Sequence, residues 1–373
     1  MNLREGSIGA LELRNTLAIA LIASGLFAMS PYALYAQGNL SYATIPASML
    51  VALIVAFVAS LAIRRGCEQS LFDMTKESIG AFAAVVLCVS IVLGLVISAI
   101  APLIQFLRIL QHYIFTADYF TIGVFIAIAI CFIGVLGFEC IGRTANVMAT
   151  VLLLTLVFIL AVPLGSYDVY RMLPAVESSA DFAVLQATEA LPLFLALLLL
   201  PLCMPKAVHG VKYARRPIVC AGAIAIVATF VALLCIALVF PYEVLRGEYA
   251  PLFRLNTLVE AEGSFVRVEK ITVFLLLAGC IIGCAYAVYG SSRLVAQLTS
   301  QRDTRPGALC IGMASVAAAC AICLYEGRID GLMECLSTAK RILGGVMAAL
   351  VIVASVVSTI KHAARGEKQV CGE

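Results

Sequence analysis

Cysteine is the residue type that first suggests chemistry in this sequence, because the chain contains 14 of them. Paired thiols carry out redox exchange or bind metal ions, and Cys320 and Cys323 have the Cys-x-x-Cys spacing of redox motifs. Cys280 and Cys284 lie one helical turn apart. All four fall in long apolar stretches without a thioredoxin-like context, where a small thiol lets helices approach each other closely. We therefore interpret the cysteines as packing residues.

The other residue types that carry out catalysis are too few or too dispersed to form a site. The chain has three histidines, His112, His209 and His362, all in or beside the segments between apolar stretches. No His and Glu cluster has the spacing of a metal site, and no Ser, His and Asp set can be assembled. The basic residues are dispersed, and the net charge of +3 does not favour nucleic acid. We expect no enzyme activity, no metal and no cofactor.

Glycine and proline in two apolar stretches mark the best candidates for ligand binding. Gly25 and Pro31 lie in the first stretch, and Pro192 and Pro201 lie in the sixth. Proline removes a backbone donor and glycine lowers the cost of unwinding, so we expect helix breaks at these four residues. A broken helix at mid-membrane offers amide hydrogens to a carboxylate and carbonyl groups to an ammonium. An amino acid carries both groups and is the ligand that we expect.

The side chains around the two breaks are the predicted ligand contacts. They are Ser24, Gly25, Phe27 and Met29 in the first stretch, and Thr188, Glu189, Pro192 and Phe194 in the sixth. Glu189 is the best-placed ionisable residue, and such residues inside a membrane are costly and usually functional. An interfacial carboxylate at the outer mouth of the protein is the other interpretation of Glu189. No series of buried carboxylates indicates a proton path, so the coupling ion of any transport stays open.

Ten apolar stretches must position these residues. Each has about 20 residues, the number that crosses the roughly 30 Å hydrocarbon core of a bilayer as a helix. The chain is 63% hydrophobic and 13% charged, with a mean hydropathy of +1.06, so little remains for a water-soluble domain. We predict an all-α polytopic membrane protein in which residues 1–373 form a single transmembrane domain. The predicted spans are 13–36, 42–63, 79–107, 119–138, 145–165, 186–205, 217–240, 271–294, 306–325 and 342–360.

Ten spans divide into two halves of five, at about 12–165 and 186–360. Because five is odd, the sixth span enters the membrane from the side opposite to the first, and any structural repeat between the halves is inverted. The first and sixth spans then occupy corresponding positions. Lysine and arginine are concentrated in the two tails and in the even-numbered loops, as at Arg64, Arg65 and Lys76. By the positive-inside rule, we expect both termini in the cytoplasm.

Five short motifs follow one another in the second half of the chain. They are YDVYRMLP at 167–174, LLLLP at 197–201, FPYE at 240–243, YAPLFRL at 249–255 and FVRVE at 265–269. This series resembles the spore germination permeases of endospore-forming bacteria, which belong to the amino acid/polyamine/organocation transporter superfamily. The chain departs from that family in the middle of span 6, where members often have a Gly-Phe-Glu-like stretch and this chain has Pro192, Leu193 and Phe194.

The resemblance implies a LeuT-like fold with a five-plus-five inverted repeat and interrupted helices 1 and 6. It also implies the membrane subunit of a nutrient germinant receptor, often for amino acids, acting with a larger membrane subunit and a lipoprotein subunit. We expect the bacterial cytoplasmic membrane or the spore inner membrane as its location. Arg267 and Glu269 form either a loop ion pair or a contact to a partner subunit or outer gate. A secondary active amino acid transporter and a scaffold with a vestigial site are the competing hypotheses.

Overall fold

Helices make up almost all of the structure, a computed structural model that describes residues 7–27, 41–63, 69–113, 119–172, 180–208, 210–240, 244, 251–260, 268–299, 304–324 and 330–370. The α-helices and the short 3-10 helices (η) run in the order α1 (Ala10–Phe27), α3 (Ser41–Ala62), α4 (Leu71–Ser78), α5 (Ala81–Tyr113), α6 (Tyr119–Leu136), α7 (Phe138–Ala161), η2 (Leu164–Ser166), η3 (Val169–Met172), α8 (Ala180–Cys203), η4 (Pro205–Val208), α9 (Val211–Val239), α11 (Pro251–Glu260), α12 (Val268–Leu298), α13 (Arg305–Leu324) and α14 (Asp330–Val370).

The prediction of an all-helical membrane protein is confirmed. Eight helices of the described chain are long and apolar enough to cross a membrane, and two shorter apolar stretches, Thr121–Leu136 and Ala187–Cys203, lie in α6 and α8. Each of the ten predicted spans overlaps one of these helices in sequence order. Several helices are longer than the predicted spans: α7 begins at Phe138, α9 begins at Val211 and α14 continues to Val370. The short helices α4 and α11 lie in segments for which no helix was expected.

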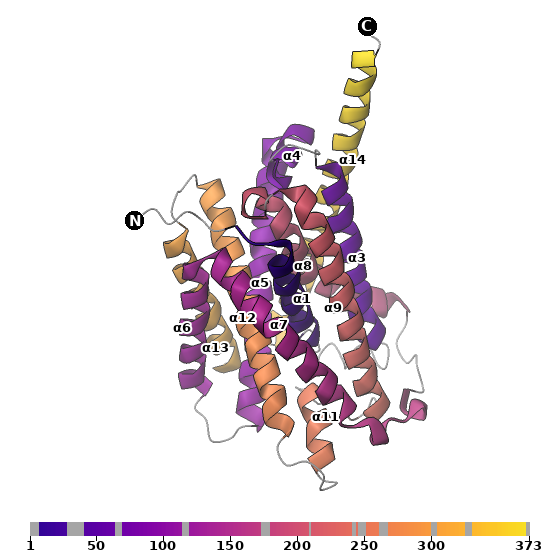
Figure 1. Cartoon of the computed structure of the whole chain (residues 1–373), viewed down its shortest axis with the longest axis vertical. Helices are drawn as coiled ribbons and strands as arrows, with labels where there is room; N and C mark the ends of the chain where they lie inside the picture. Colours follow the sequence, from indigo (N-terminus) through magenta and orange to yellow (C-terminus); the bar gives the residue numbers. More distant parts are fainter. Residues whose placement is uncertain are drawn as a thin grey trace.

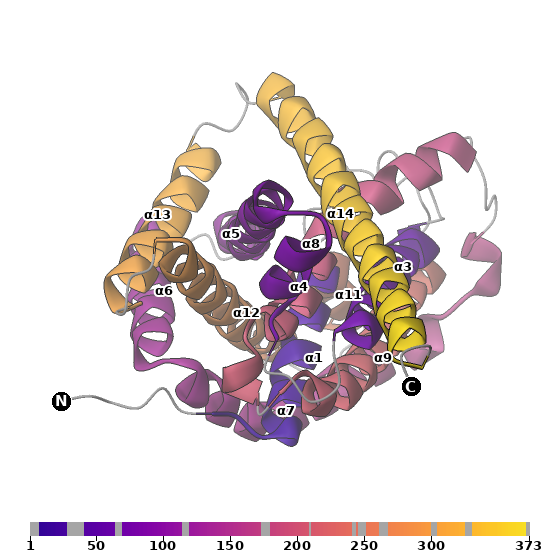
Figure 2. The ribbon, with the colours of Figure 1, turned by 90° about the horizontal axis from the view of Figure 1, so that it is seen from above.

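The bundle is arranged around helices that lack a polar face. Seen from above, α1, α5 and α8 lie in the interior, with α6, α7, α9, α3, α14 and α13 around them (Figure 2). α1 packs on α9, α12 and α7, and α8 packs on α3, α14 and α5. Every residue from Leu193 to Cys203 is buried, on all sides of α8. A helix that is apolar all round is stable only where other helices cover it, so the sequence of α8 requires this central position.

Small residues set how closely the helices approach. A Cβ added at Gly312 of α13 would lie 2.7 Å from the Cys131 sulfur of α6, and one added at Gly123 of α6 would lie 3.2 Å from the Cys320 sulfur of α13. Each of the two helices thus places a glycine against a cysteine of the other helix. On α12, the buried Cys284 thiol donates to the carbonyl of Ala99 on α5 over 3.2 Å. Such close contacts supply the van der Waals energy that holds helices together where water is absent.

Basic side chains close the ends of helices on one side of the bundle. α1 begins and α14 ends on this side, at the top of Figure 1, and we call it the terminal side. The Lys361 ammonium donates to the carbonyls of Glu77 and Ser78 at the end of α4, over 2.9 and 2.8 Å. The Arg215 guanidinium donates to the carbonyl of Ser60, near the end of α3, over 2.6 Å. Cations at helix C-termini satisfy carbonyls that lack a helical partner and oppose the helix dipole.

On the opposite side of the bundle, two residues of the first of the five family-like motifs form hydrogen bonds to the ends of helices. The Tyr167 hydroxyl donates to the carbonyl of Leu160 near the end of α7, and the Arg171 guanidinium donates to the carbonyl of Val239, the last residue of α9. Burial, together with the neighbouring Cys235 thiol, raises the pKa of the Tyr167 phenol well above its ordinary value. A tyrosine phenol is protonated at physiological pH even at its ordinary pKa of about 10, so Tyr167 is a donor there. The motif ties the ends of two helices together.

Two adjacent glycines of α14 give a test of this packing. A Cβ at Gly344 would lie 2.9 Å from Cδ of Pro192 on α8, whereas a Cβ at Gly345 would meet nothing within 4 Å. Alanine raises helix propensity equally at both positions, so the difference between the variants isolates the helix contact. We expect Gly344→Ala to be less stable than Gly345→Ala by roughly 1–3 kcal/mol, the usual cost of overpacking. Thermal unfolding in detergent measures this, and equal melting temperatures would contradict the close approach of α14 to α8.

Candidate functional site

The predicted contacts on α1 lie at its end, but they do not surround open space. Ser24, Gly25 and Phe27 are buried, and Phe27 is the last residue of this stretch that the structure describes. A Cβ at Gly25 would lie 2.6 Å from the Met49 side chain of α3 and 2.9 Å from the Thr229 hydroxyl of α9. Glycine is therefore needed here for close approach of three helices. The other two predicted positions of this stretch, Met29 and Pro31, lie outside the described residues.

The predicted break in the sixth span is wrong, because α8 is continuous from Ala180 to Cys203 with both prolines inside it. Proline at 201 cannot donate to the carbonyl one turn earlier, that of Leu197. The hydroxyl of the fully buried Tyr286 on α12 donates to this carbonyl instead, over 3.2 Å. A neighbouring helix thus supplies the missing donor, which is the way membrane helices tolerate proline. Pro192 packs between Gly94 of α5 and Gly344 of α14.

Glu189 of α8 lies between two cations of α14. Its carboxylate oxygens are 3.8 Å from the Lys340 ammonium and 3.6 Å from the Arg341 guanidinium, and we call these three residues the Glu189 cluster. The three side chains are 20–29% exposed. Nε of Arg341 is buried and has no hydrogen-bond partner among the described residues. The cluster carries one more positive than negative charge, so it retains capacity for an anion.

The remaining predicted residues lie apart from this cluster. Phe194 is fully buried in the apolar run of α8, and Thr188 is half-buried beside Glu189 in the sequence. Arg267 lies outside the described residues, and for Glu269 only the backbone, within α12, is described. The predicted pairing of these two residues therefore stays a prediction. Lys340 and Arg341 precede the last predicted span, at 342–360, and their position opposite Glu189 is set by the packing of α14 on α8.

One cavity of about 160 Å³ follows α1, and we call it the α1 cavity. One wall is the face of α1 from Arg14 to Phe27, and the others come from α7 between 149 and 156, from Ile224 of α9 and from α12 between 275 and 279. Of the predicted contacts, Phe27 lines it. The lining residues of α1 repeat at spacings of one, three and four, the pattern of one helix face, but nothing in that pattern distinguishes a cavity wall from a packed surface.

Metal chemistry has no candidate in the part of the chain that the structure describes. No group of three or more His, Cys, Asp or Glu side chains there lies close enough to hold a metal ion. Two cysteines one turn apart, Cys280 and Cys284, face each other with 3.8 Å between their sulfurs and are buried between helices.

Solved structures with a similar arrangement of helices are membrane transporters. A Na+-coupled sialic acid symporter in a substrate-bound outward-open state matches with a TM-score of 0.60 and 11% identity, covering 92% of this chain and 85% of the other. A nucleobase-cation-symport-1 family transporter with bromovinylhydantoin bound gives 0.58 and 14%, covering 94% and 78%. The manganese transporter of Eremococcus coleocola gives 0.61 and 14%, covering 94% and 86%. At these identities the likeness is one of fold.

These features define an integral membrane protein with a transporter-like fold. Its residues 16–328 match the pattern of the spore germination protein family, and the chain belongs to that family. The family resemblance predicted from the five motifs is thereby confirmed. Comparison with curated protein sequences gave no match.

Removing the carboxylate of Glu189 tests whether the cluster is energetically coupled. In Glu189→Gln, two partly buried cations lose their counter-charge, and we expect a loss of about 1–3 kcal/mol of stability, below the figure for a fully buried pair. The matched control is Glu139→Gln, which removes the exposed i,i+4 partner of Arg143 and is expected to cost about 0–1 kcal/mol. Thermal unfolding in detergent compares them. Equal losses would mean that the Glu189 cluster behaves as a surface ion pair.

Proposed function

We propose that this chain is the membrane subunit of a nutrient germinant receptor and that it binds an amino acid at mid-membrane between α1 and α8. Membership of the spore germination protein family supplies the biological context. The observation that carries the choice of ligand is the Glu189 cluster, which brings both signs of charge into the membrane-spanning part of the bundle. A sugar or a purely apolar ligand carries no charges that could pair with the opposite charges of this cluster.

A zwitterion is complementary to the Glu189 cluster. Its carboxylate pairs with the guanidinium of Arg341, whose planar fork presents two parallel donors, and its ammonium pairs with Glu189. The present distances of 3.6 and 3.8 Å are longer than hydrogen bonds, and Nε of Arg341 has no partner among the described residues. A ligand carboxylate would supply the hydrogen bonds that the cluster lacks.

The end of α1 supplies the second half of the proposed site. The hydroxyl of Thr229, fully buried on α9, has no hydrogen-bond partner within the described part of the chain and lies against Gly25. A buried hydroxyl without a partner is costly, so a ligand group that bonded to it would gain that energy. Phe27, the last residue of α1, and Phe194 of α8 are the aromatic residues that we assign to the apolar part of the ligand.

The same proposal includes a LeuT-like five-plus-five inverted repeat, with halves at about 12–165 and 186–360. The fold likeness to three transporters, over more than 90% of this chain, supports it. In this arrangement α1 and α8 are the first helices of the two halves. We place both termini in the cytoplasm and the protein in the spore inner membrane. The basic residues Arg215 and Lys361 at helix ends on the terminal side agree with that orientation.

Signalling in this scheme is a shift between two conformations. A ligand that binds one conformation more tightly increases its population, and the change passes to a larger membrane subunit and a lipoprotein subunit. Spores that lack this chain are expected to lose the response to at least one nutrient germinant. Spores with an unchanged response to every nutrient germinant would exclude the receptor role.

Ligand-dependent thermal shift of the purified protein tests the proposed site. A compound at 100 times its dissociation constant stabilises the folded state by about 2.7 kcal/mol if it does not bind the unfolded chain. We expect one or a few of the twenty amino acids to raise the melting temperature. The matching amine without a carboxylate, and the matching acid without an amine, should both fail, because each leaves one side of the cluster unpaired. A selective shift with a nucleoside or sugar would contradict the zwitterion assignment.

Two arginine variants test whether the ligand binds at the Glu189 cluster. Arg341→Gln should weaken binding by at least about tenfold, or 1.4 kcal/mol, whereas Arg143→Gln, at an exposed pair on α7, should not change it. Equal affinities in the two variants would remove the Glu189 cluster from the site. The absence of any shift, from protein that unfolds cooperatively, would favour a scaffold with a vestigial site.

A secondary active amino acid transporter is the second candidate, favoured by the fold likeness to transporters that include a Na+-coupled symporter. The two functions share one site, so the ligand screen does not separate them. Uptake of the labelled ligand into proteoliposomes does. Accumulation above the level in empty vesicles identifies a transporter, and binding without uptake identifies a receptor.

A further inference from the structure

The α1 cavity shares Phe27 with the proposed amino acid site but is otherwise separate from it. It contains neither Glu189 nor Thr229, and it extends along α1 from Arg14 to Phe27. Thirteen steps of 1.5 Å make this about 20 Å, which is more than half of the roughly 30 Å hydrocarbon core of a bilayer. An amino acid is far too short to fill a cavity of this length, whereas an acyl chain matches it.

The wall of the α1 cavity is apolar over most of this length. Between Ala18 and Phe27 its α1 face carries alanine, isoleucine, leucine and phenylalanine, and the facing residues of α12 are Leu275, Leu276 and Gly279. Such a space holds no water, because water finds no hydrogen-bond partners in it. Left empty, its wall would lose van der Waals contacts, so an apolar occupant is favoured.

The α1 cavity borders the surrounding membrane through α7. This helix is one of the outer ring in Figure 2, and two residues of the cavity wall, Thr150 and Leu153, are exposed on its surface. A lipid chain can therefore reach the cavity sideways from the bilayer without passing through the bundle.

The end of the cavity on the terminal side is polar and cationic. Nε and Nη2 of Arg14 donate to the Asn15 side-chain oxygen over 3.1 and 3.0 Å, and the Asn15 amide donates to Asn146 of α7 over 2.8 Å. Arg14 thus has a neutral partner in the described part of the chain. Its guanidinium has further donors, and it lies in the second turn of α1, toward the terminal side.

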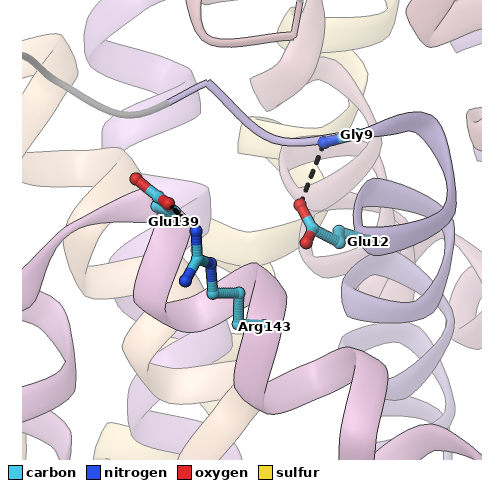
Figure 3. Close-up of polar contacts among 4 residues, drawn as sticks. All are labelled: Gly9, Glu12, Glu139 and Arg143. Carbon is cyan, nitrogen blue, oxygen red and sulfur yellow. Dashed lines mark hydrogen bonds and ion pairs between the residues drawn. The ribbon is translucent and has the colours of Figure 1, made fainter.

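The nearby carboxylates are engaged elsewhere, as Figure 3 shows. Glu12 accepts a hydrogen bond from the amide of Gly9 over 3.0 Å, and Glu139 forms an ion pair with Arg143. Among the described residues, neither of these carboxylates pairs with Arg14, so its charge can attract an anion.

We infer that the α1 cavity binds one acyl chain of an anionic phospholipid from the leaflet on the terminal side, with the lipid phosphate at Arg14 and Asn15 and the end of the chain near Phe27. Because Phe27 lines the cavity and belongs to the proposed ligand site, the bound lipid would set the position of α1 at this residue, an effect that rests on the proposed function. The chemistry required of the occupant is an anionic head joined to a chain of about 20 Å, the span given by the helical rise.

The absence of tryptophan from the chain makes a clean test possible. We would place single tryptophans by Phe27→Trp in the cavity wall, by Phe106→Trp at a buried site of α5 outside it, and by Leu154→Trp on the exposed face of α7. Each variant goes into nanodiscs containing phosphatidylglycerol or phosphatidylcholine with brominated acyl chains, because bromine quenches tryptophan fluorescence at short range. Leu156→Trp, also in the cavity wall, replaces Phe27→Trp if that variant does not fold.

We expect the cavity tryptophan to lose fluorescence in brominated phosphatidylglycerol and to lose less in brominated phosphatidylcholine. The Phe106→Trp protein should lose little in either, and the Leu154→Trp protein should lose fluorescence equally in both. Adding Arg14→Gln to the cavity variant should abolish its preference for the anionic lipid, whereas adding Arg143→Gln should leave it. A cavity tryptophan quenched no more than that at Phe106 would overturn the lipid assignment. Equal quenching by the two lipids would overturn the role of Arg14.

Discussion

Backbone polar groups inside a membrane must be satisfied without water, and this constraint is most severe for α8. The helix is buried on every side from Leu193 to Cys203, and Pro201 removes one of its hydrogen bonds. Tyr286 of α12 replaces the missing hydrogen bond, because its hydroxyl donates to the Leu197 carbonyl. The phenol can do so because it is itself enclosed between helices, with no water to compete. The continuity of α8 thus depends on a residue 85 positions after the proline.

Close approach between helices follows from the same lack of water. With no hydrophobic driving force between helices in lipid, association depends on contact between surfaces, and small residues make that contact possible. Gly25 brings α1 against α3 and α9, and Gly344 brings α14 against α8. The second contact also determines the electrostatics, because Lys340 and Arg341 lie one turn away on α14. A glycine contact therefore places two cations beside Glu189, and packing and charge are parts of one arrangement.

The two candidate binding regions differ in the physics of what they accept. The Glu189 cluster has charges of both signs and suits a zwitterion, whereas the α1 cavity has one cation at the end of an apolar channel and suits a lipid. Phe27 of α1 belongs to the wall of the cavity and to the proposed ligand site. A residue shared in this way gives the membrane a physical means of influencing ligand binding.

The sequence by itself determined the number, order and approximate bounds of the apolar helices, because crossing a bilayer demands about 20 apolar residues wherever it occurs. It also determined the family, through motifs such as that beginning at Tyr167. Tertiary structure alone decided that α8 remains unbroken, since the donor for Leu197 comes from another helix. It alone decided that Glu189 faces Lys340 and Arg341, because charge counting along the chain does not measure how helices pack. Local rules govern a residue's own helix, and the contacts that form a site belong to helices distant in sequence.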